Sequence, residues 1–136
     1  MTEFSFTIPG PPRPWKRATN KRDRQGNIIG RATDEGMRVA KAHVRACART
    51  AALMHRVRKP LDVPLEVTVQ CYRRRLSTAT PDADNYGKLV LDSGNKILWR
   101  DDSIVVRLIC EKHDTREVGG EEQTVVTVRP FVRKAA

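Results

Sequence analysis

The 136-residue sequence predicts an α+β fold: a single domain over residues 1–136, with a small mixed sheet packed by one long and one short helix. Two observations predict it. Short runs of alternating apolar and polar residues indicate strands, and two segments with apolar residues at helical spacing indicate helices. They follow in the order β-α-β-α-β-β without internal repeats, which is typical of an α+β domain. A chain of this length can bury one core without disulfides.

The first element is a strand over residues 4–8, where apolar and polar residues alternate until Pro9-Gly10-Pro11-Pro12 ends the run. Residues 13–31 are rich in arginine and lysine around Trp15, and their polar, glycine-containing sequence predicts a basic loop.

A long helix is predicted from a cap at Thr33 or Asp34 to about Arg56. At about 100° per residue its apolar residues gather on one side and most of its basic residues gather on another. The core side comprises Met37, Ala40, Val44, Cys47, Ala48, Ala51 and Met54. The basic stripe comprises Arg38, Lys41, Arg45, Arg49 and Arg56, and it is either a solvated helix back or a face that follows phosphates.

The second half of the chain predicts three further strands and one short helix. In order, they are a strand over 65–71, a helix from Ala83 or Asp84 to about 93–95, a strand over 104–112, a turn at Gly119-Gly120, a strand over 123–129 and a frayed tail over 131–136.

The charge of the chain favours a polyanionic partner. Lys and Arg number 26 against 16 Asp and Glu, a net charge of +10. Nucleic acid suits this excess best, because each phosphate contact releases condensed counterions; the alternative is a basic surface kept for solubility. No apolar run is long enough for a signal peptide or a membrane span, so we expect a cytoplasmic protein with no membrane partner. The three scattered cysteines predict reduced core residues.

Five aspartates gather within 21 residues, against the positive charge of the rest of the chain. They would repel one another unless a cation lies between them. Asp82 and Asp84 can point at one centre from a loop-to-helix junction, with Asn85 orienting them, and Lys88 stands one helical turn beyond Asp84. Asp102 comes from a separate element. Such an oxygen-rich site is typical of Mg²⁺ and of phosphodiester hydrolysis.

Each of these residues also has a purely structural interpretation. Asp82 can cap a helix, Asp84 and Lys88 can form a surface pair, and Asp101 and Asp102 can be turn residues. The combination of D-x-D-N-x-x-K, a further Asp and W-x-D-D in a strongly basic chain is more specific than any of its parts.

At these positions the sequence resembles the RusA family of Holliday-junction resolvases. The shared pattern reads Pro81-Asp82-Ala83-Asp84-Asn85-Tyr86-Gly87-Lys88, then Asp92, then Trp99-Arg100-Asp101-Asp102, and the likeness extends to residues 6–12. The resemblance implies a homodimer that resolves four-way DNA junctions by paired, symmetric nicks with Mg²⁺ or Mn²⁺. It also implies that Asp82, Asp84 and Asp102 are metal ligands and that Lys88 is an essential basic residue near the scissile phosphate.

Three further residues of this segment are candidates for supporting roles. Asn85 can orient the acids, Asp92 can hold Lys88 through an i,i+4 contact, and Asp101 can support the metal shell or fix the turn. Trp99 is expected as a core or dimer-contact aromatic, with DNA stacking as the alternative.

The candidate DNA contacts lie in the basic loop, the helix stripe and the strand end. They are Arg13, Lys16, Arg17, Arg38, Lys41, Arg45, Arg73, Arg74 and Arg75. The basic loop is longer than in some members of the family, and Arg73 to Arg75 stand further from the first acid, so which arginine approaches the phosphate stays open. Two alternatives to a junction resolvase remain: a non-catalytic basic nucleic-acid-binding protein, and a nuclease that acts on forks or flaps. A short, arginine-rich chain also fits a phage or prophage setting.

Overall fold

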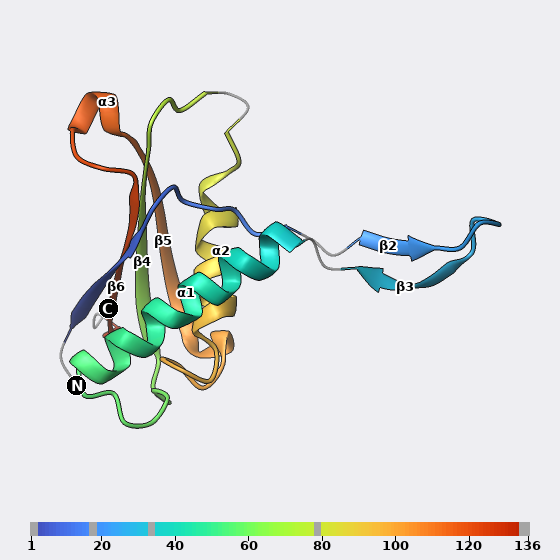
Figure 1. Ribbon diagram of the computed structural model, residues 1–136. Helices are drawn as coiled ribbons and strands as arrows, with labels where there is room; N and C mark the ends of the chain where they lie inside the picture. The colour runs from blue at the N-terminus through green and yellow to red at the C-terminus, as the bar shows by residue number, and fades with distance from the viewer. Residues whose placement is uncertain (1–2, 17–18, 33–34, 78–79, 134–136) are drawn as a thin grey trace.

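The computed structural model of this chain describes residues 3–16, 19–32, 35–77 and 80–133 (Figure 1). It confirms the predicted α+β class and the order of the main strands and helices. A four-stranded mixed sheet carries its two longer helices on one face. Among the described residues, no helix has both the length and the apolar character needed to cross a membrane.

The sheet has the strand order β1-β6-β4-β5. Its strands are β1 (Phe4–Pro9), β4 (Leu65–Arg73), β5 (Val105–Asp114) and β6 (Gln123–Pro130). β4 pairs parallel with β5 and antiparallel with β6, and β6 pairs antiparallel with β1. β5 is therefore an edge strand.

The core lies between this sheet and the helices α1 (Glu35–Met54) and α2 (Ala83–Gly94). Alternation along β4 puts Leu65, Val67 and Val69 on the helix side, where all three are fully buried. Trp99 is also fully buried, and its indole Nε1 donates to the carbonyl of Leu91 at 2.9 Å. The prediction of a core aromatic is confirmed, and the DNA-stacking alternative is excluded.

The cysteines are free thiols, as predicted. Cys71 is a core residue, and its burial raises the pKa of the thiol to about 12. Cys47 and Cys110 are only half-buried.

The predicted basic loop over 13–31 is wrong in part, because it contains an antiparallel hairpin. Its strands are β2 (Thr19–Arg22) and β3 (Ile28–Ala32), and the hairpin extends away from the body of the domain (Figure 1). A carboxylate oxygen of Asp23 accepts hydrogen bonds from the backbone N–H groups of Gln25 and Asn27 and shapes the turn. These strands lack apolar alternation because no core lies beneath them, so the sequence pattern does not reveal them.

The predicted helix stripes are confirmed on the core side and corrected elsewhere. Met37, Ala40, Val44, Ala48 and Ala51 are buried. Met54, however, is 74% exposed and is the last residue of the helix, two residues before the predicted end at Arg56. The predicted cap at Thr33 or Asp34 lies outside the described residues.

Two short elements were not predicted: η1 (Asp102–Ile104) before β5, and α3 (Thr115–Val118) after it. The tail begins later than expected, since the backbone N–H of Phe131 donates to the carbonyl of Pro64 at 2.9 Å. Residues 134–136 of the predicted tail lie outside the described residues.

Candidate functional site

Asp82 and Asp84 lie at the N-terminal end of α2, as predicted. Asp82 occupies the N-cap position, but its side chain makes no capping hydrogen bond. Both side chains are exposed, and among the described residues neither carboxylate has a hydrogen-bond or ion-pair partner. The capping interpretation of Asp82 and the surface-pair interpretation of Asp84 therefore do not apply. Two carboxylates are left open to solvent in a strongly basic protein.

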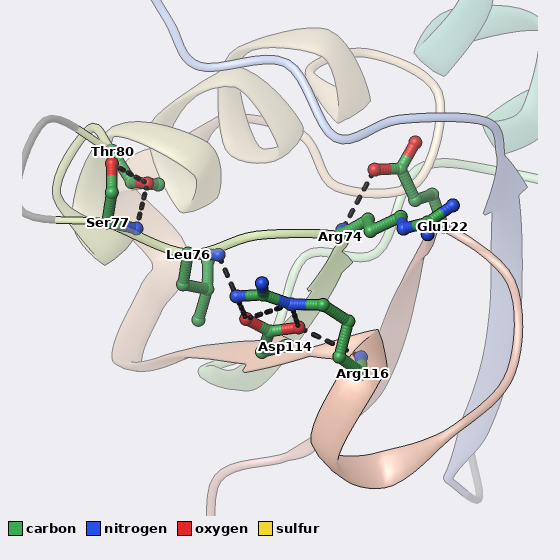
Figure 2. A network of polar contacts seen from close by, with 7 residues as sticks. All are labelled: Arg74, Leu76, Ser77, Thr80, Asp114, Arg116 and Glu122. Atoms are coloured by element: carbon green, nitrogen blue, oxygen red, sulfur yellow. Dashed lines mark hydrogen bonds and ion pairs between the residues drawn. The ribbon is translucent and has the colours of Figure 1, made fainter.

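A polar network holds the start of the connection that leads from β4 toward this pair (Figure 2). The backbone N–H groups of Arg74 and Leu76 donate to the carboxylates of Glu122 and Asp114, at 2.8 and 3.1 Å. Asp114 is itself bound by the Arg116 guanidinium at 2.7 Å, which holds the pKa of this buried carboxyl well below its usual range. The residues that follow β4 are thus hydrogen-bonded to Asp114 at the end of β5 and to Glu122 just before β6.

The residue before the pair is held in a second way. Lys112 of β5 donates from Nζ to the carbonyl oxygen of Pro81 at 3.1 Å. Lys112 was not predicted as part of the site. Lys112 could have been found from the alternation of β5, because it points to the same side of the strand as Leu108 and Cys110. Those two residues lie against Gly87 of α2, so Lys112 is a charged residue on the side that faces α2.

Lys88 does not contact the acids in this structure. Its ammonium lies 3.7 Å from the ring centroid of Trp15, a cation–π contact. The backbone N–H of Trp15 donates to the carbonyl of Asn85 at 2.9 Å, so the segment after β1 is docked on the first turns of α2. Trp15 is the second residue that sequence reasoning missed, although its position amid basic residues marked it. The role predicted for the Asn85 side chain is untested.

A cavity of about 340 Å³ opens beside this docked segment. Arg13, Lys16, Met37 and Pro81 are among the residues that line it. Two predicted DNA contacts, Arg13 and Lys16, therefore stand close to the residue that precedes Asp82. Arg17 lies outside the described residues.

The predicted contact between Asp92 and Lys88 is not formed. Asp92 instead forms an ion pair with Lys41 of α1 at 2.9 Å. Arg45, one turn further along α1, donates to the carbonyl oxygens of Ser93 and Asn95 at 3.0 and 3.3 Å. Lys41 and Arg45 therefore do not belong to an outward basic stripe, because they bind the C-terminal half of α2.

The three arginines at the end of β4 differ in environment. Arg73 donates to the hydroxyl of Tyr86 at 2.7 Å and so faces the first turn of α2. Arg74 and Arg75 are exposed, as is Arg38 on α1, whose guanidinium lies 4.0 Å from Glu35.

Asp101 and Asp102 lie at the other end of α2. The carboxylate of Asp101 accepts from the backbone N–H of Ser103 at 3.3 Å and caps η1, which supports the turn-fixing interpretation. Hydrogen bonding to Ser103, through its side chain first and its backbone N–H second, lowers the pKa of Asp101. Asp102 is exposed.

The direction of β5 separates Asp102 from the other two predicted ligands. β5 begins just after Asp102, passes Gly87 at Leu108 and Cys110, and reaches Pro81 at Lys112. Asp102 and the Asp82–Asp84 pair therefore lie near opposite ends of α2, a 12-residue helix about 18 Å long. Within the described part of the chain, no three His, Cys, Asp or Glu side chains gather as a metal site. One chain does not assemble the predicted ligand set.

The chain matches a protein family along most of its length. The family model described as Endodeoxyribonuclease RusA matches residues 9–129. A search of curated proteins finds no significant match.

Proposed function

This chain belongs to the RusA endodeoxyribonuclease family, and from that membership we propose that it resolves Holliday junctions as a homodimer, by paired hydrolysis of phosphodiester bonds with Mg²⁺ or Mn²⁺. Family membership implies a nuclease that acts on junction DNA. The metal, the dimer and the roles of individual residues are the proposed part.

The observation that carries the proposal is the open Asp82–Asp84 pair. Asp114, which supports the fold, is buried, and its carboxylate is bound by Arg116 as buried polar groups require. Asp82 and Asp84 have no such partner among the described residues, and Lys112 holds the backbone directly before them at Pro81. A fixed, unpaired carboxylate pair suits a hard divalent cation, which prefers oxygen ligands.

In the hydrolysis, a water oxygen bonds to phosphorus, the water loses a proton, the bond from phosphorus to one sugar oxygen breaks, and that oxygen takes up a proton to become a hydroxyl. Negative charge grows on the phosphate oxygens during this exchange. A bound divalent cation supplies positive charge at this centre and acidifies water. Among the described residues, one chain alone does not bring Asp82, Asp84 and Asp102 together around such a cation.

The chain's own cations stand around this centre. Lys88 lies one helical turn beyond Asp84, and Arg13 and Lys16 line the adjoining cavity. We infer that these side chains bind the phosphate and offset its charge. Lys88 reaches the phosphate by leaving the Trp15 ring, a contact worth only about 0.5–1 kcal/mol at an exposed position.

The hairpin of β2 and β3 gives the protein a second surface for DNA. It projects from the domain near the N-terminus of α1, and it carries Lys21, Arg22 and Arg24 (Figure 1). Ile28 and Ile29 are 56% and 61% exposed there, with no core to cover them. We infer that this arm lies along the junction DNA, with its cations on phosphates and its isoleucines against sugars or unpaired bases.

The test is cleavage of a synthetic four-way junction in Mg²⁺ by the wild type and by Asp82→Asn. We expect paired nicks from the wild type and a rate lower by roughly 10²–10³ for the variant, the usual cost of losing one electrostatic group at a reacting centre. Glu3→Gln is the control, because Glu3 is an exposed acid just before β1, at the opposite edge of the sheet from β5. Undiminished cleavage by Asp82→Asn would refute the proposal.

The same assay separates the alternatives. A non-catalytic binding protein would retard the junction without any metal-dependent product. A nuclease for forks or flaps would cut those substrates faster than the four-way junction.

A further inference from the structure

Asp84 and Lys88 have the spacing of an ion pair but do not form one. They stand four residues apart on α2, an arrangement in which an acid and a following lysine attract each other on a helix surface. Lys88 instead places its ammonium 3.7 Å from the ring centroid of Trp15. We propose that Trp15 is a positioning residue of the nuclease site: its ring holds Lys88 away from Asp84 and so keeps the Asp82–Asp84 pair open for a divalent cation. This inference rests on the proposed function and gives Trp15 a role at the same site.

Trp15 is itself held in place by both of the longer helices. Its backbone N–H donates to the carbonyl oxygen of Asn85 on α2 at 2.9 Å. Its ring packs against the hydrophobic core, and the residue is half-buried. The backbone N–H of the next residue, Lys16, donates to Sδ of Met37 on α1 at 3.4 Å. The ring over Lys88 is therefore a fixed part of the domain surface, and Lys88 is the exposed partner in the contact.

Two further cations near the first turns of α2 are also bound to neutral groups. Lys112 donates from Nζ to the carbonyl oxygen of Pro81 at 3.1 Å. Arg73 donates to the hydroxyl of Tyr86 at 2.7 Å. A ring, a carbonyl and a hydroxyl thus hold three positive charges beside the acid pair without using a carboxylate. The charges stay where they attract a phosphate, and the acids stay available to a cation.

The magnitudes favour the ring over the carboxylate as the partner of Lys88. An exposed cation–π contact favours the bound state by about two- to fivefold, and an exposed i,i+4 ion pair favours it by about 1.4- to 2.3-fold. Trp15 therefore competes successfully with Asp84 for the ammonium. The same small factor lets a phosphate displace the ring, so the contact with Trp15 does not prevent Lys88 from acting on DNA.

A double-mutant cycle between Trp15 and Lys88 tests this role through Mn²⁺ affinity, measured by calorimetry on the full-length protein without DNA. Trp15→Leu removes the aromatic face and keeps the backbone N–H that bonds to Asn85. Lys88 should then pair with Asp84, and Mn²⁺ affinity should fall by about two- to threefold, the extent to which an exposed helix pair competes for its carboxylate. In a Lys88→Met background the same substitution should leave Mn²⁺ affinity unchanged, because no lysine is present to pair with Asp84.

Two outcomes of this cycle would overturn the role of Trp15. If Trp15→Leu leaves the Mn²⁺ affinity of the protein with Lys88 unchanged, the ring does not protect the acid pair. If Trp15→Leu lowers the affinity equally with and without Lys88, Trp15 only supports the fold of its segment. Trp15→Phe is the conservative variant, and it should retain most of the wild-type affinity because a phenyl face still binds a cation.

The position of Lys88 can be measured directly by NMR of the metal-free protein. The ring current of an indole shifts the resonances of protons above its face upfield. The methylene protons next to the Lys88 ammonium, assigned by comparison with Lys88→Met, should therefore resonate upfield of those of the other lysines. Trp15→Leu should return them to the ordinary range. A Lys88 signal in the ordinary range in the wild type would contradict the contact with Trp15.

Cleavage of a four-way junction at different Mn²⁺ concentrations gives a kinetic test of the same role. Trp15→Leu should cut more slowly than the wild type at Mn²⁺ concentrations below saturation, because Lys88 then competes with the metal for Asp84. The difference should close at saturating Mn²⁺. A difference of the same size at all Mn²⁺ concentrations would contradict the role given to Trp15.

The two proposals fail in different ways. If the wild type does not cut junctions, the nuclease function is wrong, while the Mn²⁺ cycle and the NMR measurement still decide the role of Trp15. If the wild type cuts junctions but the cycle shows no coupling between Trp15 and Lys88, only the role of Trp15 is wrong.

Discussion

Aspartates in this protein serve opposite purposes according to what surrounds them. Asp114 is buried at the end of β5, where its carboxylate receives the guanidinium of Arg116 and the backbone N–H groups of Leu76 and Arg116. Asp82 lies at a helix N-terminus and has no partner among the described residues. Asp114 is therefore a structural residue that holds the start of the β4–α2 connection. Asp82, at the end of the same connection, is a candidate metal ligand.

Asp114 predicts a specific pH dependence of stability. Its pKa is lowered in the folded protein, mainly by hydrogen bonds from Arg116, so its contribution is complete above the unfolded pKa of about 3.9 and is lost as the pH falls further. Asp114→Asn should therefore lower the free energy of unfolding at pH 7, and the difference from the wild type should shrink below about pH 4. Urea denaturation at pH 7 and pH 3 measures this. An equal difference at both pH values would contradict the role given to the carboxylate.

Arg45 and Arg38 make a matched pair on α1. Arg45 donates to two carbonyls at the end of α2, whereas the side chain of Arg38 is 66% exposed. Arg45→Met should lower the free energy of unfolding by about 1–3 kcal/mol, the cost of removing a charged hydrogen-bond donor, and leave junction affinity unchanged. Arg38→Met should weaken junction binding without affecting stability. Urea denaturation and gel-shift titration of both variants measure these effects. Weaker junction binding by Arg45→Met, with unchanged stability, would show that Arg45 contacts DNA.

At the scale of elements, hydrophobic periodicity predicted the helices and strands that have one face buried in the core. The core face of α1, the alternation in β4 and the end of α2 at Gly94 are all read from spacing and from helix breakers. The β2–β3 hairpin was not predicted, because no core lies against it and its sequence therefore lacks apolar alternation. The contacts of Lys41 and Arg45 with α2 could not be predicted, because a helical projection gives the angle of each side chain but not the element that it faces. In the structure, α2 packs beside the basic face of α1 and binds both side chains.

Gly94 shows how closely α2 approaches the segment that follows it. A Cβ at Gly94 would lie 2.3 Å from Cζ2 of Trp99, whose ring is fully buried and cannot move aside. Gly94→Ala should cost about 1–3 kcal/mol of stability, as overpacking does. Trp99→Phe removes the ring atoms in contact, so the double variant should be less destabilised than the sum of the single variants. Strict additivity in thermal denaturation would contradict this contact.

The hairpin is predicted to bind DNA without supporting the fold. Thr19 and Ala32 are paired neighbours, so a short Gly-Ser turn can replace the residues between them. The four basic residues removed should lower junction affinity and reduce the slope of log affinity against log salt by up to about 3–4. The melting temperature should stay within a few degrees of the wild type. An unchanged salt slope in gel-shift titrations would exclude the hairpin from the DNA surface.

At the scale of the whole molecule, the positive net charge and the acidic residues have complementary positions. A net charge of +10 attracts the DNA backbone over much of the surface, and the acids interrupt that field at the ends of α2. The sequence located these acids correctly on their elements, because motif spacing is local. It could not tell that Asp102 and Asp82 lie at opposite ends of one helix, because that depends on the direction of β5 against α2.

The most direct measurement of the central claim is anomalous diffraction from crystals of the full-length protein grown with Mn²⁺. The account predicts an anomalous peak bound directly by carboxylate oxygens of Asp82 and Asp84, at about the 2.0–2.1 Å that is typical of a small divalent cation on oxygen ligands. Saturating Mn²⁺ that leaves Asp82 and Asp84 without an ion would contradict it.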